Sequence, residues 1–153
     1  MDFDFFETPL GTMALAAEDG ALVRLYLPNQ PVPRLTPHST PLLEESKGQI
    51  LAYLAGERQA FDLPLHPEGS DFQKRVWDAL LTIPYGQTAT YGQLAWQLES
   101  PRSARAVGLA CKQNPLPILI PCHRVVAADG TLGGYAGGRP MKEALLALEQ
   151  ADH

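Results

Sequence analysis

The segment IPCHRVV, residues 120–126, decides how the second half of this chain can fold. It closes an apolar run, residues 116–120, which contains Pro117 and is followed by Pro121. Proline lacks a backbone N–H and breaks helices, so we predict a short, buried, non-helical run that ends in a turn at Cys122. The imidazole and guanidinium that follow are costly to bury without partners, so we expect this turn to border a cleft.

Cys122 is a candidate nucleophile because His123 and Arg124 follow it directly. A thiol attacks as its thiolate, and an unperturbed cysteine with a pKa of about 8.5 is only a few per cent ionised near neutral pH. A neighbouring base and cation increase that fraction. The alternative is a buried cysteine that behaves as a small hydrophobic residue, which is common for free cysteines. The surrounding prolines and charges favour the nucleophile.

Composition predicts a globular chain in a reducing compartment. Its 153 residues, 45% of them hydrophobic, can build one normal core or two small ones. No apolar run approaches the roughly eighteen residues of a membrane span, and the acidic start lacks the basic region of a secretory signal. Cys111 and Cys122 have neither CxxC spacing nor the pattern of a disulfide framework. We therefore expect a cytoplasmic monomer with no membrane partner.

The charges divide the chain into two unlike halves. The net charge is −5, but residues 1–70 hold four basic and ten acidic residues, whereas residues 71–150 hold eight basic and six acidic ones. Such asymmetry suggests that the second half faces an acidic partner and the first does not.

The first half is predicted to be an antiparallel meander followed by a helix. Turn residues separate short β-prone stretches, and a proline-rich loop precedes a stretch with apolar residues near helical spacing. The expected elements are strands 3–7, 11–17 and 21–27, loop 28–41, helix 42–55, edge strand 61–65 and linker 66–69. The fold class is therefore α/β of the α+β type, with an N-terminal sheet-plus-helix domain at 1–66 and a mainly helical domain at 67–153.

Helix-start signals organise the second half. Ser70 and Gln73 form a capping box before an amphipathic helix at 71–83, and Thr90 with Gln93 repeats the box before a short helix that ends near Leu98. Ser100-Pro101 then supplies a cap and a first-turn proline for a helix at 102–113. Two short helices joined by so tight a turn are typical of a helix-turn-helix.

The helix at 102–113 has one basic face. Arg102, Arg105, Leu109 and Lys112 recur at spacings of three and four, while Ala104, Val107 and Cys111 are expected to face a core. Its small residues keep the helix thin, so that it can lie close to a phosphate backbone. A basic stripe is also common on helices that only face solvent.

Three motifs follow one another along the second half: RAVG at 105–108, NPLPI at 114–118 and PCHRVV at 121–126. They continue through GGYAGG at 133–138 and Lys142-Glu143 to Glu149. Over roughly residues 71–150 the chain resembles the O6-alkylguanine-DNA alkyltransferases, also called methylated-DNA-protein-cysteine methyltransferases. The first half fits that family only in its strand-rich pattern.

The resemblance implies a single-use repair reaction. The alkyl group of O6-alkylguanine in duplex DNA, and also that of O4-alkylthymine, would pass to Cys122 and stay there as a thioether. His123 would take the thiol proton through a water, and Glu149 would hold the imidazole. Tyr91 would donate to the leaving guanine, with Lys142 as a supporting charge.

The resemblance also implies how DNA is held. The helix-turn-helix would enter the minor groove, and Arg105 would fill the space left by the flipped base, which must leave the stack to be reached. Asn114 would tie this helix to the cysteine turn, although an ordinary Asn-Pro loop is an alternative. Arg124 either binds phosphate or braces the fold. Further candidates are Arg102, Ser103 and Lys112 for DNA, and Gly134, Tyr135, Ala136 and Gly137 for the pocket wall.

Some family features are missing, and other functions stay open. The chain has no cysteine before Cys111, so the N-terminal zinc site of some relatives is not expected, and no metal or cofactor is predicted. Ala136 stands where some members have serine, which puts pocket breadth in doubt. The alternatives are a non-catalytic lesion-binding protein, which would carry tryptophan in place of Cys122, and a cysteine hydrolase, for which no oxyanion-hole motif is evident.

Overall fold

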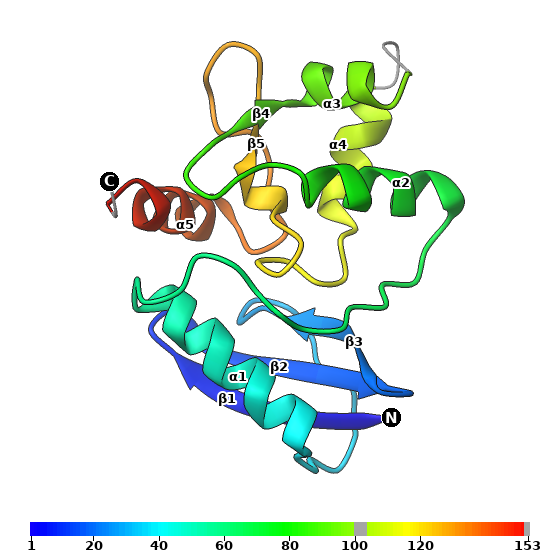
Figure 1. Cartoon of the computed structure of the whole chain (residues 1–153), viewed down its shortest axis with the longest axis vertical. Coiled ribbons are helices and arrows are strands. Elements are labelled where there is room, and N and C mark those ends of the chain that lie inside the picture. The colour runs from blue at the N-terminus through cyan, green and yellow to red at the C-terminus, as the bar shows by residue number, and fades with distance from the viewer. Residues whose placement is uncertain (100–103, 152–153) are drawn as a thin grey trace. The chain divides into compact units, whose positions relative to one another are not determined.

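The computed structural model describes residues 1–99 and 104–151 (Figure 1). The chain separates into two compact units, Met1–Glu68 and Gly69–His153, and each is described by itself. The first unit combines a sheet with one helix and the second is mainly helical, so the predicted mixed α/β fold is confirmed.

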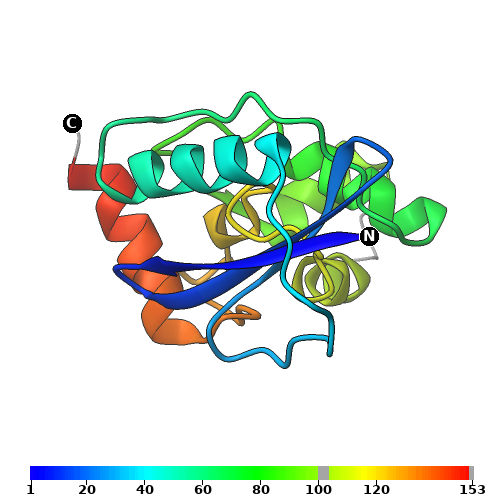
Figure 2. The same ribbon diagram turned by 90° about the horizontal axis from the view of Figure 1, so that it is seen from below.

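A three-stranded antiparallel meander forms the centre of the first unit. β1 (Asp2–Thr8), β2 (Gly11–Glu18) and β3 (Ala21–Tyr26) lie in sequence order, as predicted (Figure 2). Alternate residues of a strand point to opposite faces, so Phe3 and Phe5 share one face. Their rings meet edge to face with centroids 5.0 Å apart.

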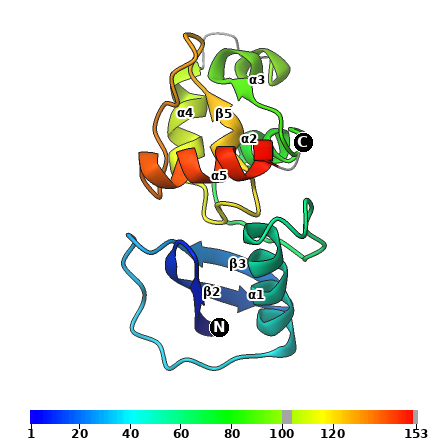
Figure 3. The ribbon, with the colours of Figure 1, turned by 90° about the vertical axis from the view of Figure 1, so that its left-hand side faces the viewer.

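One helix packs on this sheet. α1 (Pro41–Leu54) lies against β1 and β2, as Figure 3 shows. Its side chains Leu43, Ile50 and Tyr53 are fully buried. Thr40 caps the helix by accepting from the Leu43 N–H, so the helix begins one residue earlier than the sequence pattern predicts.

The predicted edge strand at 61–65 is wrong. The structure has only an isolated parallel bridge, between Leu22 and Leu65. Pro64 has no N–H to extend a ladder, and the Asp62 N–H donates instead to the side-chain oxygen of Gln49 on α1, at 2.9 Å. The segment is therefore held by side-chain and single backbone bonds.

The second unit is built from helices and one very short sheet. Both predicted capping boxes are present, at Ser70 with Gln73 and at Thr90 with Gln93. Its elements are α2 (Asp71–Leu80), β4 (Ala89–Thr90), α3 (Tyr91–Gln97), α4 (Ala104–Lys112), the 3-10 helix η1 (Cys122–Arg124), β5 (Val125–Val126) and α5 (Arg139–Ala151).

α2 ends three residues before the predicted position. Its last turn tightens, because the N–H groups of Thr82 and Ile83 donate to carbonyls three residues back, and Pro84 follows. The start of the helix predicted at 102–113, together with the Ser100-Pro101 cap, lies outside the described residues. From Ala104 onward α4 is helical as expected.

The core of this unit fixes α4 against α2. Trp77 of α2 is 1% exposed, and its indole N–H donates to the carbonyl of Ala110 on α4 at 2.9 Å. Val107 and Cys111 of α4 are also buried, as the helical pattern predicts. The buried indole therefore sets both the depth and the rotation of α4, whose opposite face is open.

Replacing Trp77 by phenylalanine should lower the free energy of unfolding by about 1–3 kcal/mol, because the Ala110 carbonyl loses a buried donor. Trp96→Phe is the matched control, since this indole is 71% exposed and its loss should change stability by less than about 0.5 kcal/mol. Urea denaturation of both variants measures the difference. Equal losses would contradict the anchoring role of Trp77.

Candidate functional site

The loop before Cys122 is folded around one asparagine. Asn114 is 4% exposed; its side-chain N–H₂ donates to the Ile120 carbonyl at 2.8 Å, and its oxygen accepts from the Leu116 N–H at 2.9 Å. These bonds close the apolar run into a compact loop in which Ile118 has φ +74. A β-branched residue adopts that conformation only when its surroundings impose it. The run is buried and non-helical, as predicted, and ends in η1.

Cys122 is sealed in this structure. It is 3% exposed, and burial raises the pKa of its thiol to about 11. A hydrogen bond with the Asn114 side chain and the positive charge of Lys142 act in the opposite direction, but they are weaker than burial. The resting thiol is therefore protonated near neutral pH.

A buried carboxylate joins His123 and Arg124. His123 Nε2 lies 2.7 Å from Glu149 Oε2, and Arg124 donates from Nε and Nη2 to the two oxygens of Glu149 at 2.8 and 3.0 Å. A carboxylate only accepts, so Nε2 carries the imidazole proton, and Nδ1 has the lone pair that can accept another. Burial lowers the pKa of His123 despite the carboxylate, so the resting imidazole is neutral.

Arg124 is placed to brace the fold. Its guanidinium also donates from Nη1 to the Ile83 carbonyl at 2.7 Å and lies 5.7 Å from the centre of the Tyr85 ring. The residue is 8% exposed, so this placement favours bracing over phosphate binding. The sequence predicted that the turn borders a cleft because the side chains of His123 and Arg124 are costly to bury without partners. A cleft is not what provides these partners. Glu149, from α5, partners both side chains in the interior instead.

A two-residue parallel sheet brings Tyr91 to the cysteine turn. β4 pairs with β5, with Ala89 opposite Val125 and Thr90 opposite Val126. Tyr91 is the next residue after β4, and burial and the charges of the two cysteines raise its pKa, so its phenol keeps its proton. Sequence analysis missed this sheet, although the β-branched residues on both sides were a signal.

Lys142 supports the same region from α5. Its side chain is fully buried, and Nζ donates to the carbonyls of Val125 and Gly134 and lies 5.9 Å from the centre of the Tyr91 ring. Burial lowers its pKa. The five residues predicted to carry the chemistry are thus drawn together: Tyr91, Cys122, His123, Lys142 and Glu149.

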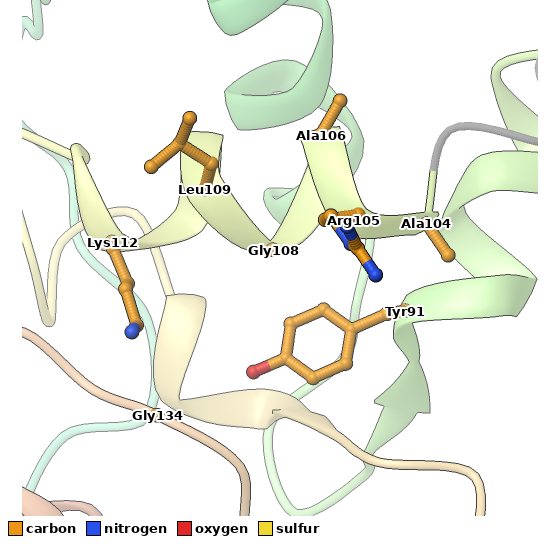
Figure 4. A pocket seen from close by; sticks show the side chains of 8 residues that line it. All are labelled: Tyr91, Ala104, Arg105, Ala106, Gly108, Leu109, Lys112 and Gly134. Carbon is orange, nitrogen blue, oxygen red and sulfur yellow. The ribbon is translucent and has the colours of Figure 1, made fainter.

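A groove of about 1000 Å³ runs along the open face of α4 (Figure 4). Arg105 and Lys112 line it from one helix, and the Tyr91 ring lies beside them; in Figure 4 the Arg105 guanidinium points toward that ring. Leu109 is 56% exposed on the same helix. The predicted basic stripe is therefore an open surface. Its remaining member, Arg102, lies outside the described residues, as does the other DNA-binding candidate on this segment, Ser103.

The glycine-rich loop closes the far side of the groove. Gly133 has φ +74, and a methyl group placed on it would lie 2.7 Å from the Tyr91 hydroxyl. One placed on Gly134 would lie 2.6 Å from Cε of Lys112. Gly133 therefore depends on glycine, whereas at Gly134 only the flexible end of the Lys112 side chain would have to move. Tyr135, Ala136 and Gly137, predicted to line the pocket, are half-buried and continue this loop.

Neither a metal-binding cluster nor a membrane-spanning helix is present among the described residues. Within 1–99 and 104–151, no group of three or more His, Cys, Asp or Glu side chains is placed to hold a metal ion. In the same part of the chain, no helix has both the length and the apolar character that crossing a bilayer requires.

The packed pair α3 and α4, together with the buried Cys122, His123 and Glu149, fits the class of DNA-binding proteins with a reactive cysteine, and comparisons identify the family. The family profile described as "6-O-methylguanine DNA methyltransferase, DNA binding domain" matches residues 71–151, and that of the ribonuclease-like domain of the same family matches residues 1–67. The chain belongs to the 6-O-methylguanine DNA methyltransferase family.

Individual relatives match over nearly the whole chain. A methylated-DNA–protein-cysteine methyltransferase of Methanosarcina acetivorans is 44% identical and aligns over 97% of this chain and 98% of its own. The constitutive enzyme of that name from Bacillus subtilis is 42% identical, over 96% and 94%. The crystal structure of Mycobacterium tuberculosis OGT in complex with DNA superposes with a TM-score of 0.93 at 43% identity, over 99% and 94%.

Changing Glu149 to glutamine should lower the free energy of unfolding by about 3 kcal/mol or more, because it leaves the buried guanidinium of Arg124 without its counter-charge. Glu143→Gln, on the exposed side of the same helix, is the control and should cost less than about 0.5 kcal/mol. Chemical denaturation near pH 7 measures both. A Glu149 variant as stable as the control would show that the cluster does not depend on this charge.

Proposed function

We propose that this protein repairs DNA by moving the alkyl group of O6-alkylguanine onto its own Cys122 in a single, irreversible turnover. The observation that carries the proposal is a buried cysteine beside a His123–Glu149 pair in a chain 44% identical to a methylated-DNA–protein-cysteine methyltransferase. Double-stranded DNA is the partner, and the OGT relative that superposes at TM-score 0.93 was solved in complex with DNA.

α4 is the element that meets the duplex. Its open face presents Arg105, Leu109 and Lys112, and small residues between them leave the helix backbone accessible. A slender cationic helix suits the narrow minor groove, where phosphates lie close on both sides. Arg105 takes the place of the extruded base, since a planar cation can stand in the stack and bond the orphaned partner.

The transfer step follows from the neutral resting state. His123 accepts the thiol proton at Nδ1 through a water, and the resulting imidazolium is stabilised by Glu149. The sulfur then forms a bond to the alkyl carbon as the bond from that carbon to guanine O6 breaks. The electron pair leaves with guanine, which receives a proton from the Tyr91 hydroxyl, while Lys142 supports the phenolate.

The thioether product explains why the protein is used once. A carbon–sulfur bond of this type offers water no good leaving group, so the alkyl group stays on Cys122. O4-alkylthymine is proposed as a second substrate because it presents an alkyl carbon on a ring oxygen in the same way. No metal or other cofactor takes part in any of these steps.

Two alternatives fit less well. A non-catalytic lesion-binding protein would not need the thiol, whereas in this chain Cys122 directly precedes His123, whose imidazole is paired with Glu149. A cysteine hydrolase requires the imidazole and an oxyanion site to converge on an open thiol. Here the thiol is 3% exposed, which suits a substrate that is delivered by a large partner.

The two halves divide the work in this proposal. Residues 67–153 bind DNA and accept the alkyl group, and residues 1–66 form a separate sheet-plus-helix domain. We place the protein in the cytoplasm as a monomer, because both of its cysteines are free thiols and a reducing compartment preserves them.

Cys122→Ser should abolish alkyl uptake and leave DNA affinity nearly unchanged, since the thiol is buried away from the groove surface. Intact mass after incubation with a duplex bearing one O6-methylguanine is the measurement, and wild type should gain one methyl per chain. Cys111→Ala is the matched control and should still take up the methyl group. Undiminished uptake by the Cys122 variant would refute the assignment, and repeated turnover by wild type would refute single use.

Arg105→Ala should slow repair in duplex DNA by roughly tenfold or more, but slow the reaction with free O6-benzylguanine much less, because only the duplex has to be opened. Arg139→Ala removes an exposed cation outside the groove and should alter neither rate appreciably. Single-turnover rates on the two substrates measure the ratio. Equal losses on both substrates would count against a role in base extrusion.

A further inference from the structure

Lys112 lies directly over Gly134 in the glycine-rich loop, which lines the groove along α4. A methyl group on Gly134 would be 2.6 Å from Cε and 3.3 Å from Nζ of this lysine, so the side chain rests on the Gly134 backbone (Figure 4). The same glycine's carbonyl accepts from Lys142 Nζ at 3.3 Å. The backbone of Gly134 therefore lies between the exposed ammonium group of Lys112 and the buried ammonium group of Lys142.

The reaction requires this region to open. The alkyl carbon must reach Sγ of Cys122, yet that residue is 3% exposed and is not among those that line the groove. Lys142, on the inner side of the loop, is close enough to act electrostatically on the thiol. Any path from the groove to Cys122 that passes the loop at Gly134 is covered by Lys112.

Lys112 is weakly held where it lies. It is an exposed residue, and the ion pairs among residues 1–99 and 104–151 do not include it. Its contact with Gly134 is made by the aliphatic stem, which a lysine can withdraw while its charged end moves through solvent. Two ammonium groups on opposite sides of one peptide also repel each other, and this favours the departure of the outer one.

We propose that Lys112 is a specificity-determining residue: in the free protein it covers the entrance to the Cys122 pocket, and a DNA phosphate draws it away. The inference rests on the proposed alkyl transfer and predicts that duplex DNA reacts faster than small alkylated bases. A phosphate beside α4 attracts the ammonium group, and the entrance opens as the strand binds. A free base carries no phosphate and meets the covered entrance.

Two variants separate the effect of the Lys112 charge from the effect of its side chain covering the entrance. Lys112→Ala removes both, so transfer from free O6-benzylguanine should rise roughly fivefold as the open fraction grows, while repair of an O6-methylguanine duplex at low salt should slow. Lys112→Met keeps a long side chain over Gly134 without its charge. It should slow duplex repair similarly but leave the free-base rate near that of wild type.

A matched control and an independent probe complete the test. Lys74→Ala removes an exposed lysine from α2, outside the groove, and should change neither rate by more than about twofold. The rate at which iodoacetamide alkylates Cys122, mapped by peptide mass, measures how accessible the thiol is without any repair chemistry. This rate should be higher in Lys112→Ala only. Melting temperatures of the three variants should match wild type, since both lysines are exposed.

The outcomes distinguish this inference from the function on which it rests. If Lys112→Ala reacts with O6-benzylguanine and iodoacetamide at wild-type rates, Lys112 does not cover the entrance. A free-base rate that rises equally in the Met variant would show that charge, and not cover, is responsible, and would also overturn the inference. If wild type takes no alkyl group from either substrate, the proposed function fails, and the iodoacetamide comparison still decides the role of Lys112.

Discussion

The site depends on one buried carboxylate. Glu149 is 1% exposed and receives hydrogen bonds from His123, from two nitrogens of Arg124 and from the Gly86 N–H at 3.2 Å. These donors belong to η1 and to the turn before β4, whereas Glu149 belongs to α5. An unpaired charge in this interior would cost several kcal/mol, so the three segments are stable only when they meet at this point. The geometry of the catalytic residues is therefore part of the stability of the unit.

That constraint connects the proposed chemistry to the groove along α4, the surface proposed to meet DNA. The turn held by Glu149 leads into β4, whose pairing with β5 positions Tyr91, and Tyr91 in turn lines the groove along α4. From the other direction, Asn114 binds the loop between α4 and Cys122 through two backbone bonds. α4 is thus connected to Cys122 by two routes. One passes through Tyr91 and the β4–β5 pairing, and the other passes through the loop that Asn114 holds.

Local patterns predicted some parts of this arrangement well and others poorly. α2, α3 and the non-helical run before Cys122 were predictable from the sequence. Their signals are the capping boxes at Ser70 and Thr90 and the prolines around Cys122, which act on residues close by in the chain. The prediction of an edge strand at 61–65 failed because the Asp62 N–H donates to a distant side chain, Gln49, and Pro64 has no N–H. The role of Arg124 stayed open for a similar reason. Its partner is twenty-five residues away on α5, and charge alone does not tell a buried brace from a phosphate ligand.

The electrostatics of the resting site also fit a protein that reacts once. Burial raises the pKa of Cys122 and lowers that of His123, so thiol and imidazole are both neutral at rest. With its pKa raised to about 11 by burial, the thiol is almost wholly protonated at pH 7. A chain that cannot be regenerated loses its function to any stray electrophile or oxidant, and these attack the thiolate. Keeping the pair neutral until a base enters and supplies a reacting carbon therefore preserves the single turnover for DNA.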